Sequence, residues 1–218
     1  MKYKLEWVFT IKGGGKIRFY SDWLEGDHAL ATGEELEKTG KAHELAFEDE
    51  IGTEWTMKEM RRLLEETEEE PHDVIVYFDG GFMKETNEAG LGVVLFFRQG
   101  KKKFRVRANE RIGEMETNNE AEYAALYFAA TLLEEYGIKN MPCEIRGDSQ
   151  GVLKQLEGEW PCYEEVLNGW LDRIEKKLES NGIKPSFKVI SRSENKEADK
   201  LATQALDGKR IHAKTQLL

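Results

Sequence analysis

Val74-Ile-Val-Tyr-Phe-Asp79 is a run of β-branched and aromatic residues that ends in a carboxylate and is followed by Gly80-Gly81. Pro71 precedes the run, and boundaries of this kind are typical of a short buried strand. We therefore expect a central strand at residues 74–79 and a turn at Gly80-Gly81. The Asp79 carboxylate should then be exposed at the end of the strand.

Three later segments each add an acid that could reach the same place. They are Thr117-Asn-Asn-Glu-Ala-Glu122, Arg146-Gly-Asp148-Ser-Gln150 and Asn195-Lys-Glu-Ala-Asp199. Crowded carboxylates repel one another, and hard divalent cations such as Mg²⁺ relieve this repulsion by taking oxygen ligands. Two such ions a few ångströms apart are the usual means of cleaving a phosphodiester. The four segments therefore predict an acidic cluster with this chemistry.

From residue 73 the pattern predicts strands and helices in a regular order. Strands at 74–79, 90–98 and 101–112 form an antiparallel meander, and a helix at 117–136 begins at a capping box of Thr117 and Glu120. The later elements alternate, with strands at 143–146 and 186–191 and helices at 149–157, 161–180 and 194–206. Strands joined through helices are parallel with right-handed crossovers. The expected class is α/β, with a mixed five-stranded sheet flanked by helices.

The beginning of the chain predicts a separate, small α+β domain. Strands are expected at 2–11 and 16–20 around a turn at Gly13-Gly14-Gly15, and again at 41–47 and 53–55. Helices are expected at 27–39 and after a capping box formed by Thr56 and Glu59. The predicted organisation is this domain at 1–66, an acidic linker at 67–72, the α/β domain at 73–210 and a tail at 211–218.

Composition limits the class of protein. The chain has 218 residues, of which 39% are hydrophobic, enough for one or two packed cores. Two cysteines, Cys143 and Cys162, are too few for a disulfide framework and lack metal-ligand spacing. No apolar run reaches membrane-spanning length and the first residues do not read as a signal peptide, so we expect a cytoplasmic protein that does not contact membranes.

Charge is spread unevenly along the chain. The net charge is −10, which argues against binding nucleic acid by bulk electrostatics alone but not against an enzyme whose metal ions meet the phosphate. Residues 1–70 hold 10 Lys and Arg against 18 Asp and Glu, a net of −8, whereas residues 71–218 have a net of −2. This difference supports a domain boundary near residue 70.

The acidic segments carry a family resemblance when they are read in order. Tyr77-Phe-Asp79-Gly-Gly, Thr117-Asn-Asn-x-x-Glu122, Asp148-Ser-Gln and Asn195-x-x-x-Asp199 resemble the motifs of the type 1 ribonuclease H family. Each piece alone is weak, but four in the right order make a strong signal over residues 73–207. The acidic first part resembles, less specifically, an extension found beside such domains in some Gram-positive bacteria.

This resemblance implies an endonuclease that cleaves the RNA strand of an RNA–DNA hybrid. By the family pattern, Asp79, Glu122, Asp148 and Asp199 would hold two Mg²⁺ ions, with Mn²⁺ as a substitute. One ion would lower the pKa of the attacking water, and the other would stabilise the leaving 3′ oxygen. The rival interpretation is a non-catalytic or very weakly active protein that keeps the fold and serves as a nucleic-acid-binding adaptor.

Further positions match the family residues that contact the hybrid. Asn118, Asn119 and Gln150 match positions that reach 2′-hydroxyl groups and minor-groove base edges, for which amides suit well. Gly80 and Gly81 would let the backbone approach the RNA. The alternative for the asparagines is that they satisfy backbone amides at a helix start.

Two departures from the family pattern concern positive charge. Many relatives carry a histidine on the loop before the last helix, whereas this chain has Arg192 there, which could contact a phosphate or form a loop salt bridge. The basic handle of some bacterial relatives is also missing, because residues 156–165 are acidic. Its best replacement is the alternating set Lys101, Lys103, Arg105 and Arg107, which either binds phosphate or solubilises an outer sheet face. We therefore expect weak binding of the hybrid.

The first domain does not resemble a hybrid-binding module. Its net charge of −8 would repel phosphate. Trp7, Trp23 and Trp55 are expected in its core rather than as base-stacking platforms. Docking of a protein partner is the remaining hypothesis for this domain.

Overall fold

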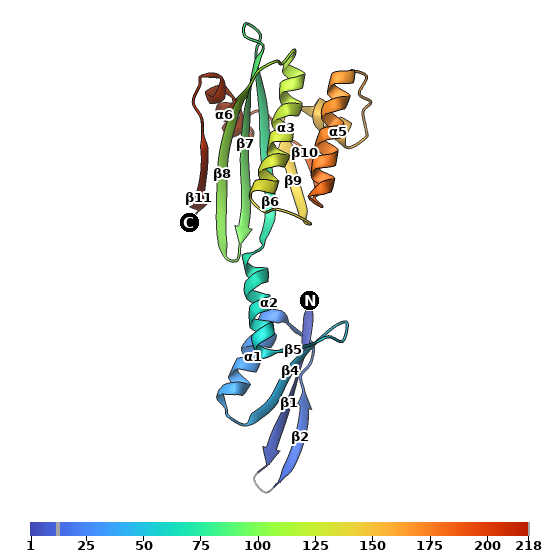
Figure 1. Cartoon of the computed structure of the whole chain (residues 1–218), viewed down its shortest axis with the longest axis vertical. Coiled ribbons are helices and arrows are strands. Elements are labelled where there is room, and N and C mark those ends of the chain that lie inside the picture. Colours follow the sequence, from blue (N-terminus) through green and yellow to red (C-terminus); the bar gives the residue numbers. More distant parts are fainter. Residues whose placement is uncertain (12–13, 218) are drawn as a thin grey trace. The chain divides into compact units, whose positions relative to one another are not determined.

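A computed structural model describes residues 1–11 and 14–217, without the side chains of residues 66–69. The chain divides into two compact units, Met1–Glu70 and Pro71–Leu218 (Figure 1). Residue 13 of the predicted Gly13-Gly14-Gly15 turn lies outside the described residues. Each unit has a hydrophobic core of its own.

The first unit is a small sheet covered by two helices. Its elements are β1 (Lys2–Ile11), β2 (Gly15–Tyr20), β3 (Leu24–Glu25), α1 (Gly26–Lys38), β4 (Ala42–Asp49), β5 (Glu54–Thr56) and α2 (Met57–Glu69). The strands lie in the order β2-β1-β4-β5, and β3 pairs with the start of β1. The core is small, with Leu5, Phe47 and Met60 fully buried. Trp7 and Trp55 pack against it as expected, but Trp23 is 45% exposed, so the prediction of a core role for Trp23 is wrong.

Helix α2 begins at the predicted capping box. The Glu59 carboxylate accepts from the Thr56 amide at 2.9 Å, and the Glu59 amide donates to the Thr56 hydroxyl at 3.2 Å. The helix continues to Glu69, and Pro71 already opens the next strand, so the predicted linker at 67–72 is wrong. Glutamates are good helix formers, and the proline disfavours helical backbone at the residue before it.

The second unit is a mixed sheet with helices on both faces. Its elements are β6 (Pro71–Met83), β7 (Glu88–Gln99), β8 (Lys102–Ile112), α3 (Asn118–Glu135), β9 (Pro142–Gly147), α4 (Gln150–Leu156), α5 (Glu165–Ser180), β10 (Lys184–Val189), α6 (Lys196–Leu206) and β11 (His212–Leu217). The strand order is β10-β9-β6-β7-β8-β11. The antiparallel meander β6-β7-β8 and the parallel pairs β6-β9 and β9-β10 are confirmed.

The sheet has six strands rather than the expected five. Residues 211–218 were expected to be a tail, but β11 pairs antiparallel with β8, from His212 opposite Ala108 to Leu217 opposite Lys103. The strand is mostly exposed on both faces, so its sequence lacks the alternation that reveals a strand. Its contribution is to give hydrogen-bond partners to the otherwise free edge of β8.

Two other boundaries differ from expectation. The predicted turn at Gly80-Gly81 is wrong, because β6 continues through both glycines to Met83 and pairs with β7 over that length. Helix α5 begins at Glu165 and not at Pro161. The segment before it instead packs on neighbouring helices, with Gln155 donating to the Pro161 carbonyl and Asn168 to the Cys162 carbonyl.

The two faces of the second sheet are covered unequally. Helices α3 and α5 lie over one face, where Phe78, Leu95 and Ile145 are fully buried, and α6 lies over the other (Figure 1). Gly90 and Gly92 of β7 make the close approach of α6 possible, because a Cβ atom at either glycine would overlap a backbone carbonyl of that helix. The strand backbone thereby fixes the position of α6 and of the residues at its beginning.

Candidate active site of the second unit

Strands β6 and β9 bring the first two acids together. The strands are parallel, and their last residue pair is Tyr77 with Arg146. Asp79 and Asp148 each lie two residues further along, close enough that the charge of Asp148 raises the pKa of Asp79. Asp79 is only 8% exposed, so the expectation of an exposed carboxylate at this strand end is wrong. The carboxyl ends of parallel strands are where ligand sites of α/β sheets form.

Glu122 lies near the beginning of α3. Thr117 is the N-cap, and its hydroxyl accepts from the Glu120 amide at 3.1 Å. A Cβ atom at Gly80 would overlap the Ala121 carbonyl group, so the helix backbone lies directly on β6. In this arrangement the Gly80 amide lies near the Glu122 carboxylate and lowers the pKa of that carboxyl group. Gly80 therefore sets the distance between the helix and the strand, a role that the sequence did not predict.

Asn195 connects the acids to the beginning of α6. It is 1% exposed and occupies the N-cap of α6 without capping it through its side chain. Its amide nitrogen instead lies 2.9 Å from the Phe78 carbonyl oxygen, 2.7 Å from an Asp148 carboxylate oxygen and 3.5 Å from one of Asp79. One side chain thus joins the ends of β6 and β9 to α6.

Asp199 completes the group one turn into α6. Its amide donates to the Asn195 carbonyl at 3.1 Å, so its position follows from that of Asn195. Its negative charge raises the pKa of Asp79. The structure therefore brings together all four acids that the sequence singled out.

Burial and mutual repulsion raise the pKa values of two acids in the cluster. Burial, followed by the charges of Asp148 and Asp199, raises the pKa of Asp79 to about 7. Burial, followed by the charges of Asp79 and Asp148, raises the pKa of Glu122 to about 8. Arg192 opposes both shifts. A bound cation would therefore displace protons that the raised pKa values of Asp79 and Glu122 favour.

The donors suit a hard divalent cation. All four are carboxylates, and Glu122 Oε2 is buried without a hydrogen-bond partner among the described residues. The described side chains do not, however, form a ready cage, since no three acidic, histidine or cysteine groups among them lie close enough to hold one ion. A bound ion would therefore need small side-chain movements and water ligands, which Mg²⁺ usually keeps.

The predicted substrate-binding residues near the four acids differ in their exposure and in their contacts. Asn118, Asn119 and Gln150 are exposed at the starts of α3 and α4. The Arg192 side chain is 95% exposed, and its Nε lies 3.4 Å from Asp148 Oδ2. The salt-bridge alternative for Arg192 is thus present, and the exposed guanidinium can still reach a phosphate.

Two of the four cations that were candidates for phosphate binding form ion pairs within the domain. Arg105 and Arg107 pair with Glu197 of α6 at 3.4 and 2.9 Å. Lys103 remains exposed beside Phe96, and Lys101 lies in the turn before β8. Two of the four cations therefore hold α6 against β8, a role that the alternation pattern did not reveal.

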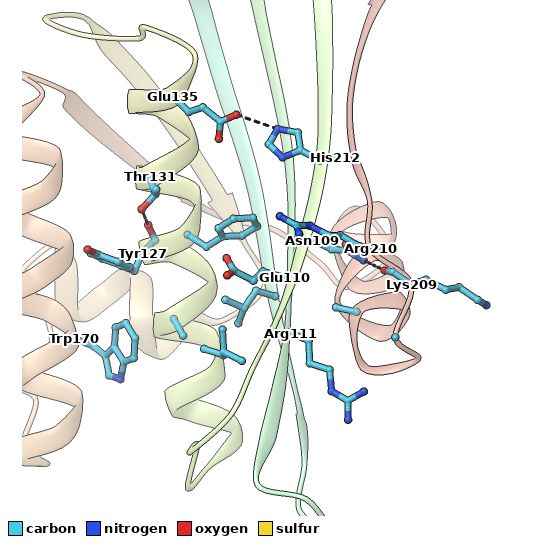
Figure 2. A pocket seen from close by; sticks show the side chains of 16 residues that line it. Asn109, Glu110, Arg111, Tyr127, Thr131, Glu135, Trp170, Lys209, Arg210 and His212 are labelled. Carbon is cyan, nitrogen blue, oxygen red and sulfur yellow. Dashed lines mark hydrogen bonds and ion pairs between the residues drawn. The ribbon is translucent and has the colours of Figure 1, made fainter.

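One large hollow of the second unit is not lined by any of the four acids. It has a volume of about 940 Å³ and lies between α3, β8 and the chain that leads into β11 (Figure 2). Figure 2 shows Tyr127 and Thr131 on its α3 side and His212 paired with Glu135 at 3.2 Å. Its charged lining is mixed, because Glu110 and Glu135 accompany Arg111, Lys209 and Arg210.

Besides Gly80, three residues position the site without having been predicted to do so. Asn195 stood inside a recognised motif, but the sequence assigned it no contact of its own. Gly90 and Gly92 alternate within a strand, which is a signal for close approach of another backbone. Nothing in the sequence, however, identifies α6 as the element that approaches.

Comparison with known proteins identifies the second unit. Residues 77–205 match the model of the family described as reverse transcriptase-like, more than half of the chain. The sequence is 36% identical over 135 residues to ribonuclease HI of Halobacterium salinarum, covering 62% of this chain and 64% of that protein. The chain belongs to the reverse transcriptase-like family, and its second unit is a ribonuclease H domain. The resemblance to the type 1 ribonuclease H family is confirmed.

Solved structures of ribonuclease H domains match the same part of the chain. The crystal structure of ribonuclease H1 from Halobacterium salinarum has a TM-score of 0.55 and 35% identity, covering 62% of this chain and 98% of that one. LC11-RNase H1 in complex with an RNA/DNA hybrid has a TM-score of 0.53 and 30% identity, with the same coverage. These matches confirm the α/β fold class of the ribonuclease H domain.

The first unit is matched together with the ribonuclease H domain. The uncharacterised protein YpeP of Bacillus subtilis is 44% identical over all 218 residues and 96% of its own length. This similarity includes the acidic first unit, so that the two units occur together in a second protein. No helix in the described part of the chain combines the length and apolar character needed to cross a bilayer.

Proposed function

We propose that the ribonuclease H domain is a divalent-metal-dependent endonuclease that cleaves the RNA strand of RNA–DNA hybrids. The observation that carries the proposal is the convergence of four acids from β6, α3, β9 and α6 on one edge of the sheet. A ribonuclease H1 with 30% identity is described in complex with an RNA/DNA hybrid, which supports this class of substrate.

The four acids would bind the metal ions, and neighbouring residues would hold the acids in position. Asp79, Glu122, Asp148 and Asp199 would hold two Mg²⁺ ions, or Mn²⁺ in their place, which supply an activated water and stabilise the leaving oxygen. Asn195 orients Asp148 and Asp79 through its amide, and the Gly80 amide lies near the Glu122 carboxylate. The rigid strand ends and first helical turns keep these carboxylates in place before substrate arrives.

Selection of RNA would depend on exposed amides near the acids. Asn118, Asn119 and Gln150 can both donate to and accept from a 2′-hydroxyl group, the feature that distinguishes RNA from DNA at a given position. Gly81 leaves room for close approach, because a Cβ atom there would make only an ordinary 3.5 Å contact with Leu206. Arg192 would meet a phosphate next to Asp148.

The deciding experiment compares three substrates. Purified protein and its Asp148→Asn variant are incubated with labelled RNA–DNA hybrid, duplex DNA and duplex RNA in Mg²⁺ or Mn²⁺. We expect cleavage of the hybrid alone, reduced at least about a hundredfold by the substitution. Asp172→Asn, a substitution of an exposed acid on α5, is the matched control and should leave cleavage unchanged.

The adaptor alternative rests on the missing loop histidine, where this chain has Arg192, and on the poor basic surface, because Arg105 and Arg107 pair with Glu197 inside the fold. Binding of the hybrid without turnover, equal in the protein and in Asp148→Asn, would establish that alternative. Location in the cytoplasm remains a prediction for either function.

For the first unit we propose docking of a protein partner. Its surface exposes Phe19 by 41% and Trp23 by 45% in a segment whose net charge is −8. If the unit instead helped to bind substrate, Phe19→Glu and Trp23→Glu would raise the KM for the hybrid. An unchanged KM would exclude a contribution to substrate binding.

A further inference from the structure

Part of the second sheet remains open on the face that carries α6. Side chains two residues apart on a strand share a face, so Tyr77 of β6 lies on the same face as Asp79. In the neighbouring strands, Tyr77 pairs with Arg146 of β9, and Arg146 pairs with Lys188 of β10. Phe96 of β7 lies one row away on the same face, because it pairs with Ile75. We call the surface formed by these residues the open face.

Two aromatic rings occupy the middle of the open face, each with a cation beside it. Tyr77 and Phe96 meet edge to face, with ring centroids 6.0 Å apart. The Arg146 guanidinium lies 5.3 Å from the Tyr77 ring and donates to its hydroxyl at 2.6 Å. Lys103 Nζ lies 5.6 Å from the Phe96 ring. Both rings are half-buried and stand apart from the main hydrophobic core, so packing of that core does not explain them.

A hollow lies on each side of the aromatic pair. One, of about 200 Å³, is lined by Tyr77, Phe96 and Asn195 together with the beginning of α6. The other, of about 330 Å³, is lined by the same two rings and by Ile75 and Lys103. Asn195, which lines the first hollow, also donates to Asp79 and Asp148, so this hollow lies next to the residue that contacts the acidic cluster.

The spacing of residues along β6 and β9 also places the aromatic ring and the cation close to the acids. Tyr77 precedes Asp79 by two residues, and Arg146 precedes Asp148 by two. At a rise of about 3.3 Å per residue, the aromatic and cationic row lies roughly 7 Å from the row of acids. A strand whose scissile phosphate meets the acids would therefore reach this row with its neighbouring nucleotides.

Outside the acidic cluster, the open face carries more cations than acids, in a chain whose net charge is −10. Its cations are Arg98, Lys103, Arg105, Arg107, Arg146 and Lys188, and its acids are Asp73, Glu144, Glu194 and Glu197. Arg98 pairs with Asp73, and Arg146 with Glu144. Lys188 pairs with Arg146 in the strand register, and its charge lowers the pKa of both Glu144 and Glu194. The excess of cations over acids favours a polyanion as the occupant.

We propose that the open face binds a single-stranded segment of RNA that continues from the acidic cluster. Unstacked bases can lie on Tyr77 and Phe96 and fill the two hollows, whereas the bases of a duplex cannot leave their stack without cost. Lys103 and Lys188 meet the phosphates of this segment. The choice of RNA over DNA rests on the proposed function, in which the strand held by the acids is RNA.

The test measures binding without cleavage. A labelled single-stranded RNA of about 12 nucleotides is titrated with the full chain in EDTA at several salt concentrations, and fluorescence anisotropy reports binding. The Lys103→Ala, Lys188→Ala double variant should bind more weakly, and its slope of log affinity against log salt should be shallower by roughly 1.4. Phe96→Ala should weaken binding by about fivefold or more, with the slope unchanged.

A matched control removes the same charge elsewhere. Lys139 and Lys176 are exposed on other parts of the domain, and their double alanine variant should bind RNA as the unchanged protein does. Equal loss in both double variants would overturn the proposal, as would no loss in either. Tighter binding of DNA of the same sequence, or equal competition by polyglutamate through the same lysines, would also overturn it and would identify a different polyanion.

The result is independent of hybrid cleavage. Lysine-dependent RNA binding without any cleavage of hybrid in Mg²⁺ would refute the proposed function and leave the binding surface standing. Cleavage of hybrid without lysine-dependent RNA binding would overturn the surface alone. Thermal unfolding of each variant confirms that the fold is retained.

Discussion

The amide of Asn195 donates a 2.7 Å hydrogen bond to the carboxylate of Asp148, across 47 residues of sequence. The same nitrogen reaches the carbonyl of Phe78 and lies 3.5 Å from Asp79. An uncharged donor thus stands between two acids that repel each other. This single contact links the end of β9, the end of β6 and the start of α6.

Replacement of this side chain should loosen the whole cluster. We expect Asn195→Ala to lower the free energy of unfolding by about 1–3 kcal/mol, because a buried carbonyl and a carboxylate lose their donor. Hybrid cleavage should fall by roughly 10- to 100-fold, as is usual when a group that orients metal ligands is removed. Chemical denaturation and initial rates measure these effects. Asn168→Ala, which removes one exposed hydrogen bond to the Cys162 carbonyl, is the control and should change neither quantity appreciably.

Gly80 and Gly81 are adjacent but should respond in opposite ways to the same substitution. Gly80→Ala would force a Cβ atom into the Ala121 carbonyl group, so we expect a loss of at least about 2 kcal/mol in stability and a loss of cleavage. Gly81→Ala makes only an ordinary contact and should leave the melting temperature almost unchanged. If the hybrid approaches the backbone at Gly81, that variant raises KM while kcat is retained. Equal melting temperatures for the two variants would contradict the close contact between β6 and α3.

The buried acids should make stability fall as pH rises in the absence of divalent metal. The pKa of Asp79 is about 7 in the folded protein, well above its value near 3.9 in unfolded chains, so the folded state binds more protons between these pH values. The contribution of Asp79 is therefore fully favourable below about pH 4 and is lost as pH approaches about 7. Glu122, with a pKa of about 8, extends the decline to that pH.

The variant Asp79→Asn isolates this effect. In EDTA it should be more stable than the unchanged protein by at least about 1 kcal/mol at about pH 8, and by much less at about pH 5. Denaturant unfolding at both pH values measures the difference. A difference that does not change with pH would show that Asp79 is not held near its neighbours. Addition of Mg²⁺ at about pH 8 should raise the melting temperature of the unchanged protein only.

The last strand should contribute to stability although its side chains are mostly exposed. Lys214 Nζ lies 4.2 Å from the ring centroid of Phe104 and 4.9 Å from that of Phe97. We expect Lys214→Ala to cost about 0.5–2 kcal/mol, measured by thermal unfolding. Lys209→Ala, in the loop before β11, removes the same charge without a ring beneath it and should be nearly neutral. Similar losses in the two variants would show that the rings are not the cause.

Several local features of the molecule could be predicted from sequence because they depend on near neighbours. The run at residues 74–79 gives a buried strand, and the Thr56–Glu59 and Thr117–Glu120 pairs give helix starts that the structure contains. Glycines 90 and 92 carried a signal for close approach, but only the packing of α6 shows what approaches. The polar strand β11 gave no signal, because its formation depends on the free edge of β8 rather than on its own side chains.

Four acids in a recognisable order, an amide-rich helix start and a mixed α/β succession of elements can all be read from the sequence. Three contacts appear only once the chain is folded: Asn195 donates to Asp79 and Asp148, Arg105 and Arg107 pair with α6, and Tyr77 and Phe96 share an open face with Lys103 and Lys188. Hydrogen bonds and charge pairs act over only a few ångströms. Strand pairing and helix packing bring distant residues within that range, and local sequence patterns do not encode which residues will meet.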